Sequence, residues 1–334
     1  MLHSINKPEI IIPKEDEYLI DYDASSLYPS LLISYGFYPK HLGKEFLDIY
    51  SKIRTERLEA KHNGDKIKNE TYKLLLNSVT GNMQSEYSWL CDTEAVMKIR
   101  MNGQLFLLKL AEMLTSVTNC RPIQYNTDGI FVLCKKKDRE IVEKTIKEFE
   151  EFSLLTMEGE EFEAMYQFAI NDYIAVKKGY SETKDSKLIK KKGLFIDSVA
   201  LGKGMAPMVI PKALCNYFVN GISPEESLEN DKDLRDFCTY QKVDKKFKVE
   251  YGGQPVTHIN RFYMSTNGKP LIKYELKDGI KIRPTLICAG SPVTIINNFK
   301  DLSTKGKNIN YNYYKREIYK IIDQMNSKQL SLWD

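Results

Sequence analysis

Two aspartates of this 334-residue chain are placed where they could bind divalent metal ions. Asp23 follows residues 17–22, whose alternating apolar side chains predict a strand, and Asp128 lies in a predicted hairpin turn. Mg²⁺ prefers oxygen ligands, and carboxylates that meet in a fold can hold it while leaving positions open for substrate phosphates. Each aspartate alone also has a structural explanation, because such residues often cap helices or form turns.

Cationic and amide side chains between these aspartates have a spacing that suits a triphosphate. Arg57 and Lys61 are four residues apart, so they share one face of a predicted helix, and Lys73 and Asn77 share a face of the next. Together they could clamp phosphate oxygens. Ordinary solvated helix charge is the alternative for each residue taken alone.

Hydrophobic period and turn signals predict the elements that must position these residues. A short helix is expected from Tyr28, and two helices at 45–60 and 66–79 flank the turn sequence HNGD, which makes them a helical hairpin. A third helix is expected at 94–117. Alternation on both sides of Asn-Thr-Asp-Gly (126–129) predicts a β-hairpin, in which Asp-Gly favours the left-handed turn.

The rest of the chain is predicted to be mixed. A helix is expected at 138–152, with strands near 162–168, 172–176 and 187–195. Ser223 and Pro224 open a capping box that predicts a helix start, and a closing helix is expected at 313–325.

Composition limits the class of protein. With 42% hydrophobic and 28% charged residues the chain is predicted to be globular, and no apolar run approaches the roughly 20 residues that cross a bilayer. We therefore expect a cytoplasmic protein with no membrane partner. Six cysteines without a C-x-x-C pair and four dispersed histidines predict reduced thiols and no zinc site.

The net charge of +4 is too small to indicate a nucleic-acid partner, but its distribution is uneven. Lysines gather at 177–192 and again at 242–248. A solvated surface and a phosphate-binding track explain these basic stretches equally well.

Three segments, taken in order, resemble the core motifs of family B DNA polymerases. DYDASSLYPS (21–30) is similar to D-x-x-S-L-Y-P-S, KLLLNSVTG (73–81) to K-x-x-x-N-S-x-Y-G, and QYNTDGIF (124–131) to Y-x-D-T-D. Residues 171–195 resemble the lysine-tyrosine segment that touches primer–template DNA, and PMVIPKAL and INRFYMSTNGKPLIK resemble the thumb of phage-encoded members. The resemblance is tight up to residue 131 and looser beyond it.

This resemblance implies an α+β right-hand polymerase fold with an antiparallel-sheet palm, short helical-hairpin fingers and a mixed, largely helical thumb. The implied divisions are palm 1–43, fingers 44–82, palm 83–200, and thumb with C-terminal region 201–334. The implied activity is DNA-templated addition of dNTPs to the 3′ end of primer–template DNA, with two Mg²⁺ ions, or Mn²⁺, as cofactors. A phage-encoded member would act in the host cytoplasm.

The resemblance also implies roles for the matching residues. Asp23 and Asp128 would be the catalytic metal ligands, joined by the backbone carbonyl of Ala24. The nucleotide would contact the Ser26 and Leu27 amides, the Tyr28 ring beneath its sugar, the cations Arg57, Lys61 and Lys73, and Asn77. Tyr28 would thereby exclude a 2′-hydroxyl. The DNA would contact Tyr173, Lys191, Lys192 and Gly193, whereas Tyr311, Tyr313 and Tyr314 could either follow the duplex or pack in a core.

Three positions depart from the family pattern. Asn126 replaces the first aspartate of the third motif, which removes a supporting carboxylate but leaves Asp128, the indispensable one. Thr80 stands where the family usually has a tyrosine that checks the nascent base pair. Asn171 stands at a usual lysine position, which would weaken the grip on the primer.

The start of the chain predicts a polymerase region without its own 3′–5′ exonuclease. Few residues precede the first motif, and HSINK (3–7) resembles the segment that joins exonuclease to polymerase. We expect a cut-down chain or one half of a split gene, with a separate exonuclease chain or domain as a further partner. The gaps between motifs are too short for the insertions of protein-primed members, which implies a nucleic-acid primer.

Two other classes remain open. One is a catalytically silent subunit that binds primer–template DNA and needs a partner chain. The other is a reverse transcriptase, which would normally show two adjacent aspartates in the hairpin where this chain has Asn-Thr-Asp-Gly (126–129).

Overall fold

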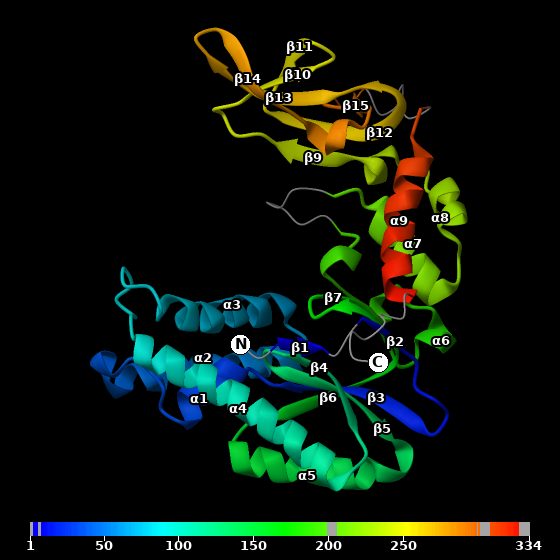
Figure 1. Ribbon diagram of the computed structural model, residues 1–334. Coiled ribbons are helices and arrows are strands. Elements are labelled where there is room, and N and C mark those ends of the chain that lie inside the picture. The colour runs from blue at the N-terminus through cyan, green and yellow to red at the C-terminus, as the bar shows by residue number, and fades with distance from the viewer. Residues whose placement is uncertain (1–2, 6–7, 199–205, 299, 301–307, 327–334) are drawn as a thin grey trace, which may run out of the picture. The chain divides into compact units, whose positions relative to one another are not determined.

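The computed structural model describes residues 3–5, 8–198, 206–298, 300 and 308–326. Residues 6 and 7 of the predicted joining segment lie outside this set. The chain divides into two compact units, residues 1–165 with 175–190, and residues 166–174 with 191–334 (Figure 1).

An eight-stranded sheet organises the first unit, and its residues 166–169, 172–174 and 191–192 are counted with the second unit. Its strand order is β1-β4-β5-β3-β6-β7-β8, and β2 also pairs with β6. The strands are β1 (His3–Ile5), β2 (Glu9–Ile11), β3 (Glu17–Ala24), β4 (Arg121–Asn126), β5 (Gly129–Lys135), β6 (Met157–Ala169), β7 (Asp172–Lys177) and β8 (Ile189–Lys192). Antiparallel pairing of β3 with both β5 and β6 places β3 inside the sheet.

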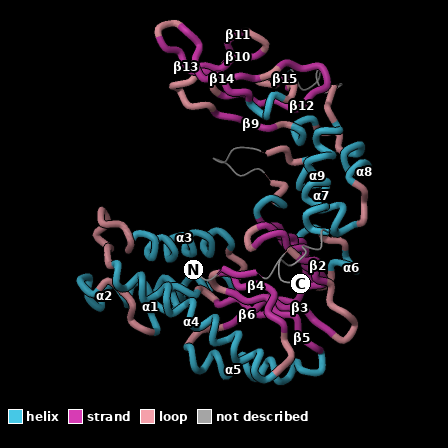
Figure 2. Tube along the Cα trace, viewed as in Figure 1, coloured by secondary structure: helices cyan, strands magenta, loops and turns pink. Residues whose placement is uncertain are grey.

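The first unit also contains the α-helices α1 (Leu27–Ser34), α2 (Gly43–His62), α3 (Lys66–Asn82), α4 (Thr93–Val117), α5 (Arg139–Ser153) and α6 (Tyr180–Thr183). Figure 2 shows α4 and α5 along one side of the strands. Their apolar stripes share one core with Tyr18, Ile20 and Tyr22 of β3. Because successive side chains of a strand point to opposite faces, Asp21 and Asp23 belong to the other face of the sheet.

The helical hairpin predicted before and after HNGD is present as α2 and α3. Gly64 has a φ of 73° in the connecting loop, and the Asp65 carboxylate caps α3 by accepting from the Lys68 amide at 3.0 Å. The Tyr50 hydroxyl of α2 donates to the Leu76 carbonyl of α3 at 3.0 Å. These contacts hold the two helices side by side, as the turn signal predicted.

The hairpin β4–β5 also forms where the alternation of apolar residues predicted it, but the left-handed residue of its turn is not the predicted one. The left-handed residue is Thr127, with a φ of 47°, whereas Gly129 does not adopt a positive φ. The expectation that Asp-Gly supplies the left-handed turn is therefore wrong. Glycine is needed at 129 for a different reason, which lies in the site.

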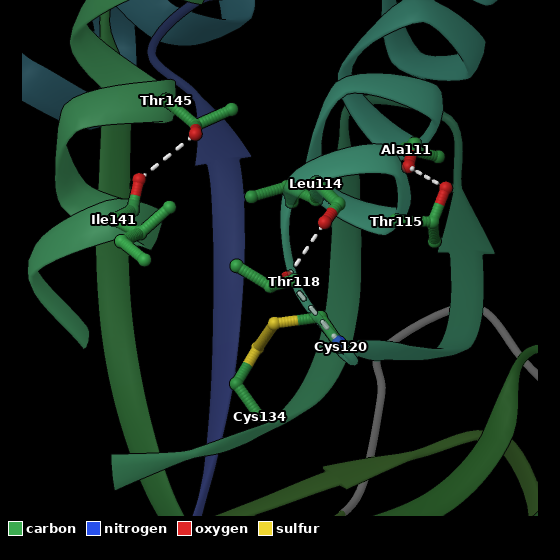
Figure 3. Close-up of a disulfide and its surroundings, with 8 residues drawn as sticks. All are labelled: Ala111, Leu114, Thr115, Thr118, Cys120, Cys134, Ile141 and Thr145. Atoms are coloured by element: carbon green, nitrogen blue, oxygen red, sulfur yellow. Dashed lines mark hydrogen bonds between the residues drawn. A yellow bond between two sulfur atoms is a disulfide. The ribbon is translucent and has the colours of Figure 1, made fainter. Parts of the chain in front are cut away.

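Figure 3 shows a disulfide between Cys120 and Cys134, so the prediction of reduced thiols is wrong for this pair. Arg121 of β4 pairs with Leu133 of β5, and this register brings the neighbouring cysteines opposite each other, with Cα atoms 4.3 Å apart. A pairing that depends on strand register is invisible in a scan for C-x-x-C spacing. Cys91, Cys215, Cys238 and Cys288 are free thiols, as expected.

The second unit combines helices with two antiparallel sheets. Its helices are α7 (Val209–Cys215), α8 (Pro224–Asn230) and α9 (Tyr311–Asn326), and Ser223 caps α8 as predicted. One sheet has the order β15-β12-β9, from β15 (Val293–Ile295), β12 (Ile259–Lys269) and β9 (Thr239–Lys242). The other has the order β11-β10-β13-β14, from β11 (Gln254–Val256), β10 (Lys248–Tyr251), β13 (Leu271–Lys277) and β14 (Ile280–Leu286).

The expectation of a largely helical region at 201–334 is therefore wrong for residues 239–295, which contain seven strands. The overlooked signals are the turn pairs Gly252-Gly253 and Asp278-Gly279, all four with positive φ, which close the hairpins β10–β11 and β13–β14. The Tyr314 ring of α9 is buried in this unit, and its hydroxyl donates to the Phe237 carbonyl at 2.7 Å. Core packing therefore explains this tyrosine.

Candidate active site

A cavity of about 580 Å³ lies in the first unit beside the end of β3, the start of α1 and the hairpin α2–α3. Every residue predicted to bind metal or nucleotide lines it: Asp23, Ala24, Ser26, Leu27, Tyr28, Arg57, Lys61, Lys73, Asn77 and Asp128. These residues come from four separate stretches of sequence. The fold thus brings together the residues to which the resemblance implies these roles.

Sheet register brings the two carboxylates together. Asp23 of β3 is directly opposite Gly129 of β5, and the Ala24 amide donates to the Asp128 carbonyl at 2.7 Å. The end of β3 is thereby bonded to the β4–β5 turn that carries Asp128. Thr127 beside it holds a left-handed backbone that a β-branched residue rarely adopts, so this turn is strained next to the carboxylates.

Gly129 is required because the carboxylates come so close to its backbone. A Cβ atom at this position would lie 2.8 Å from Asp23 Oδ1, 3.1 Å from the Tyr22 carbonyl oxygen and 3.2 Å from Asp21 Oδ1. Any side chain here would push against both carboxylates. The glycine after Asp128 therefore keeps open the space that two acidic side chains share.

Electrostatics at the carboxylates favour a bound cation. Solvent reaches Asp23 through the cavity, yet the surrounding protein removes part of its hydration, and this raises its pKa to about 7, with further repulsion from Asp128 and Asp21. In the described part of the chain no lysine or arginine forms an ion pair with Asp23. A divalent ion would relieve this repulsion.

The start of α1 forms the wall above the carboxylates. Ser26, with a φ of 57°, precedes the first turn, and no side chain caps that turn. Its hydroxyl accepts a hydrogen bond from Arg57 of α2, whose Nε also donates to Asn69 Oδ1 at 3.2 Å. The backbone amides at the start of α1 and the Arg57 guanidinium thus lie together at one side of the cavity, where they could donate hydrogen bonds to phosphate oxygens.

The helical hairpin supplies the remaining predicted nucleotide contacts. Lys73 and Asn77 of α3 are exposed along the cavity. Lys61 of α2 also faces the cavity, but its ammonium is ion-paired with Glu158 of β6 at 2.7 Å. That pair is exposed on both sides, so it is worth at most about 1 kcal/mol and can be exchanged for a phosphate contact.

Among the charged residues of this cavity that sequence reasoning missed are Arg100 of α4 and Glu158 of β6. Arg100 lies near the Tyr28 hydroxyl and partly offsets the increase in its pKa that burial causes. Glu158 is opposite Asp23 in the β3–β6 pairing. Neither residue belongs to a recognisable motif, and only strand register or helix packing brings them to the site.

The predicted DNA-contacting residues belong to the second unit. Tyr173 is fully buried with the Lys192 ammonium 5.5 Å from its ring centre, and Lys191 is paired with Asp197 at 2.6 Å. Gly193, with a φ of 59°, has no room for a side chain beside Asp172. Tyr173 itself offers no accessible surface to a ligand, so any contact from this group falls to the lysines and the backbone.

The donors at the carboxylates fit Mg²⁺ or Mn²⁺. They are carboxylate oxygens of Asp23 and Asp128 and the backbone at Ala24, all hard oxygen groups. Among the residues described, no group of three or more His, Cys, Asp and Glu is arranged to hold a metal. A site of two carboxylates that shares its ions with substrate phosphates needs no such group.

Comparison with known proteins gives a fold. No family model matches the chain, and no curated protein matches it. Solved structures do match, among them the family B DNA polymerase from the hyperthermophilic archaeon Pyrobaculum calidifontis, with a TM-score of 0.51 and 13% sequence identity. The alignment covers 98% of this chain and 48% of that one, so this chain spans about half of its length. The fold is therefore α+β with antiparallel sheets, similar to that of a family B DNA polymerase.

None of the helices in the described ranges is long and apolar enough to cross a membrane.

Proposed function

We propose that this chain is a DNA-templated DNA polymerase module, which adds dNTPs to a primer 3′ end. It is a family B enzyme of the phage type with palm, fingers and thumb at the predicted boundaries. The observation that carries the proposal is that Asp23 and Asp128 line the same cavity as the cations of the hairpin α2–α3 and the start of α1.

The residues that line the cavity would each have a role in this reaction. Asp23 and Asp128, with the Ala24 carbonyl, would hold two Mg²⁺ ions, which on binding would acidify the primer 3′-hydroxyl and stabilise the leaving pyrophosphate. Arg57 and Lys73 would orient the triphosphate and neutralise its charge. Tyr28 would close against C2′ of the sugar and select deoxynucleotides.

Primer extension with purified protein, Mg²⁺ and dNTPs tests the proposal, with DNA and RNA templates side by side. We expect extension on DNA, and its loss when Asp23 or Asp128 is changed to Asn. Duplex binding, measured by fluorescence anisotropy, should persist in both variants because neither carboxylate is assigned to the DNA.

The outcomes separate the alternatives. Duplex binding without extension would identify a silent primer–template-binding subunit, and a preference for RNA templates would identify a reverse transcriptase. Near-normal turnover in the Asp23→Asn or Asp128→Asn variant would rule out the two-metal assignment.

A further inference from the structure

Asp21 is a buried carboxylate beside the site to which the proposed reaction gives no role. It is 7% exposed, precedes Asp23 by two residues on β3, and therefore points to the same face of the sheet. Its Oδ1 and Asp23 Oδ1 both lie close to Gly129, at 3.2 Å and 2.8 Å from the position that a Cβ would have there. Its Oδ2 lies 3.2 Å from the Lys190 ammonium.

Lys190 is held in a defined position. Besides the bond to Asp21, its ammonium lies 5.6 Å from the ring centre of Phe131 and 5.9 Å from that of Phe162. Both rings are buried and their centres are 5.2 Å apart. One carboxylate and two aromatic faces thus fix a positive charge next to the catalytic strand.

The acids of the neighbouring strand have lysines of their own. Glu158 and Glu160 of β6 are opposite Asp23 and Asp21, and they pair with Lys61 at 2.7 Å and with Lys177 at 2.6 Å. The ion pair of Lys190 is with a carboxylate of β3, at 3.2 Å from Asp21 Oδ2.

We propose that Asp21 and Lys190 form a charge-balancing pair that positions Lys190 and tunes the cation affinity of the metal site. The proposal rests on the proposed function, because it assumes that Asp23 and Asp128 bind divalent ions. When all three carboxylates are ionised, Asp21, Asp23 and Asp128 carry three negative charges and Lys190 carries one positive charge, so the cluster has a net charge of about −2. Asp21 acts through Lys190 and is a positioning residue.

Two single variants and their combination test this idea. Asp21→Asn removes the partner of Lys190 and leaves the cluster with a net charge of about −1. Lys190→Met leaves the cluster with about −3, and the double variant returns it to about −2. We expect Asp21→Asn to weaken cation binding about tenfold, Lys190→Met to strengthen it, and the double variant to lie within about threefold of the unmodified protein.

Binding is measured with Mn²⁺ alone on the full chain, from the loss of the free-ion electron paramagnetic resonance signal. A melting curve for each variant reports folding separately. Asp23→Asn serves as the control for the site itself and should lose Mn²⁺ binding. If it does not, the metal assignment of the proposed function fails, independently of any role of Asp21.

The double variant decides the proposal. If it binds Mn²⁺ as weakly as Asp21→Asn, then Asp21 is a ligand or a purely structural residue and charge balance is refuted. Equal affinities in all variants would refute it too. Should Asp21→Asn fail to fold, Lys190→Met remains informative, because it must bind Mn²⁺ more tightly than the unmodified protein.

Discussion

Substitution of Gly129 by alanine tests the site geometry without removing any charged group. The added Cβ would lie 2.8 Å from Asp23 Oδ1 and 3.2 Å from Asp21 Oδ1, so the Asp23 carboxylate must retreat by a few tenths of an ångström. Because Gly129 does not adopt a positive φ, its backbone conformation is open to alanine. In a strand alanine is preferred over glycine by about 0.5–1 kcal/mol, so a loss of function would come from the contacts of the added Cβ, with the two carboxylates and with the Tyr22 carbonyl oxygen at 3.1 Å.

The size of the effect follows from overpacking. Forcing one extra carbon into a filled space typically costs about 1–3 kcal/mol. If that cost falls on the position of the metal-binding carboxylate in the transition state, kcat/KM for a single nucleotide incorporation should fall about five- to 150-fold. Duplex affinity should be unchanged.

Gly159→Ala is the matched control. Gly159 lies on β6, the other neighbour of β3, and a Cβ there would meet the Tyr22 ring at 3.1 Å and Ile20 Cδ1 at 3.2 Å, on the helix-covered face. We expect a similar change in melting temperature but near-normal turnover. Equal loss of turnover in both variants would show a general sensitivity of the sheet, and full activity of Gly129→Ala would refute the close approach to Asp23.

Three further predictions concern selectivity, nucleotide binding and stability. Tyr28→Ala should raise the rNTP/dNTP ratio of kcat/KM, mainly through better rNTP use; an unchanged ratio in a folded variant would refute the steric role. Lys73→Ala should raise the KM for dNTP about ten- to a hundredfold and leave the affinity for duplex DNA unchanged. A loss confined to duplex binding would mean that Lys73 contacts the template and not the nucleotide. Cys120→Ser should lower the free energy of unfolding by about 3 kcal/mol in urea without reductant, because the Cys120–Cys134 disulfide closes a short loop. The difference should vanish with reductant, and its persistence would mean that the cysteine contributes by packing.

Local signals were sufficient for several elements of both units. The sequence HNGD marked the break between α2 and α3, Asn-Thr-Asp-Gly marked the hairpin β4–β5, and Ser223-Pro224 marked the start of α8. Such signals act within a few residues, through backbone conformation and capping, so a single sequence carries them in full. The strands of 239–295 were missed although residues 272–277 and 280–283 alternate apolar and charged side chains and glycine turns close two of the hairpins.

The sequence by itself also predicted ten of the residues that line the cavity, through the resemblance of three short segments and the cations between them. What it could not contain is the effect of strand register. Asp21 and Lys190 are 169 residues apart, Glu158 reaches Asp23 only across the β3–β6 pairing, and Cys120 meets Cys134 only across β4–β5. The need for glycine at 129 likewise arises from a neighbouring strand. Contacts of this kind depend on which strands pair and at which residue, and a shift of one residue would move every side chain to the other face. Only the tertiary structure decides them.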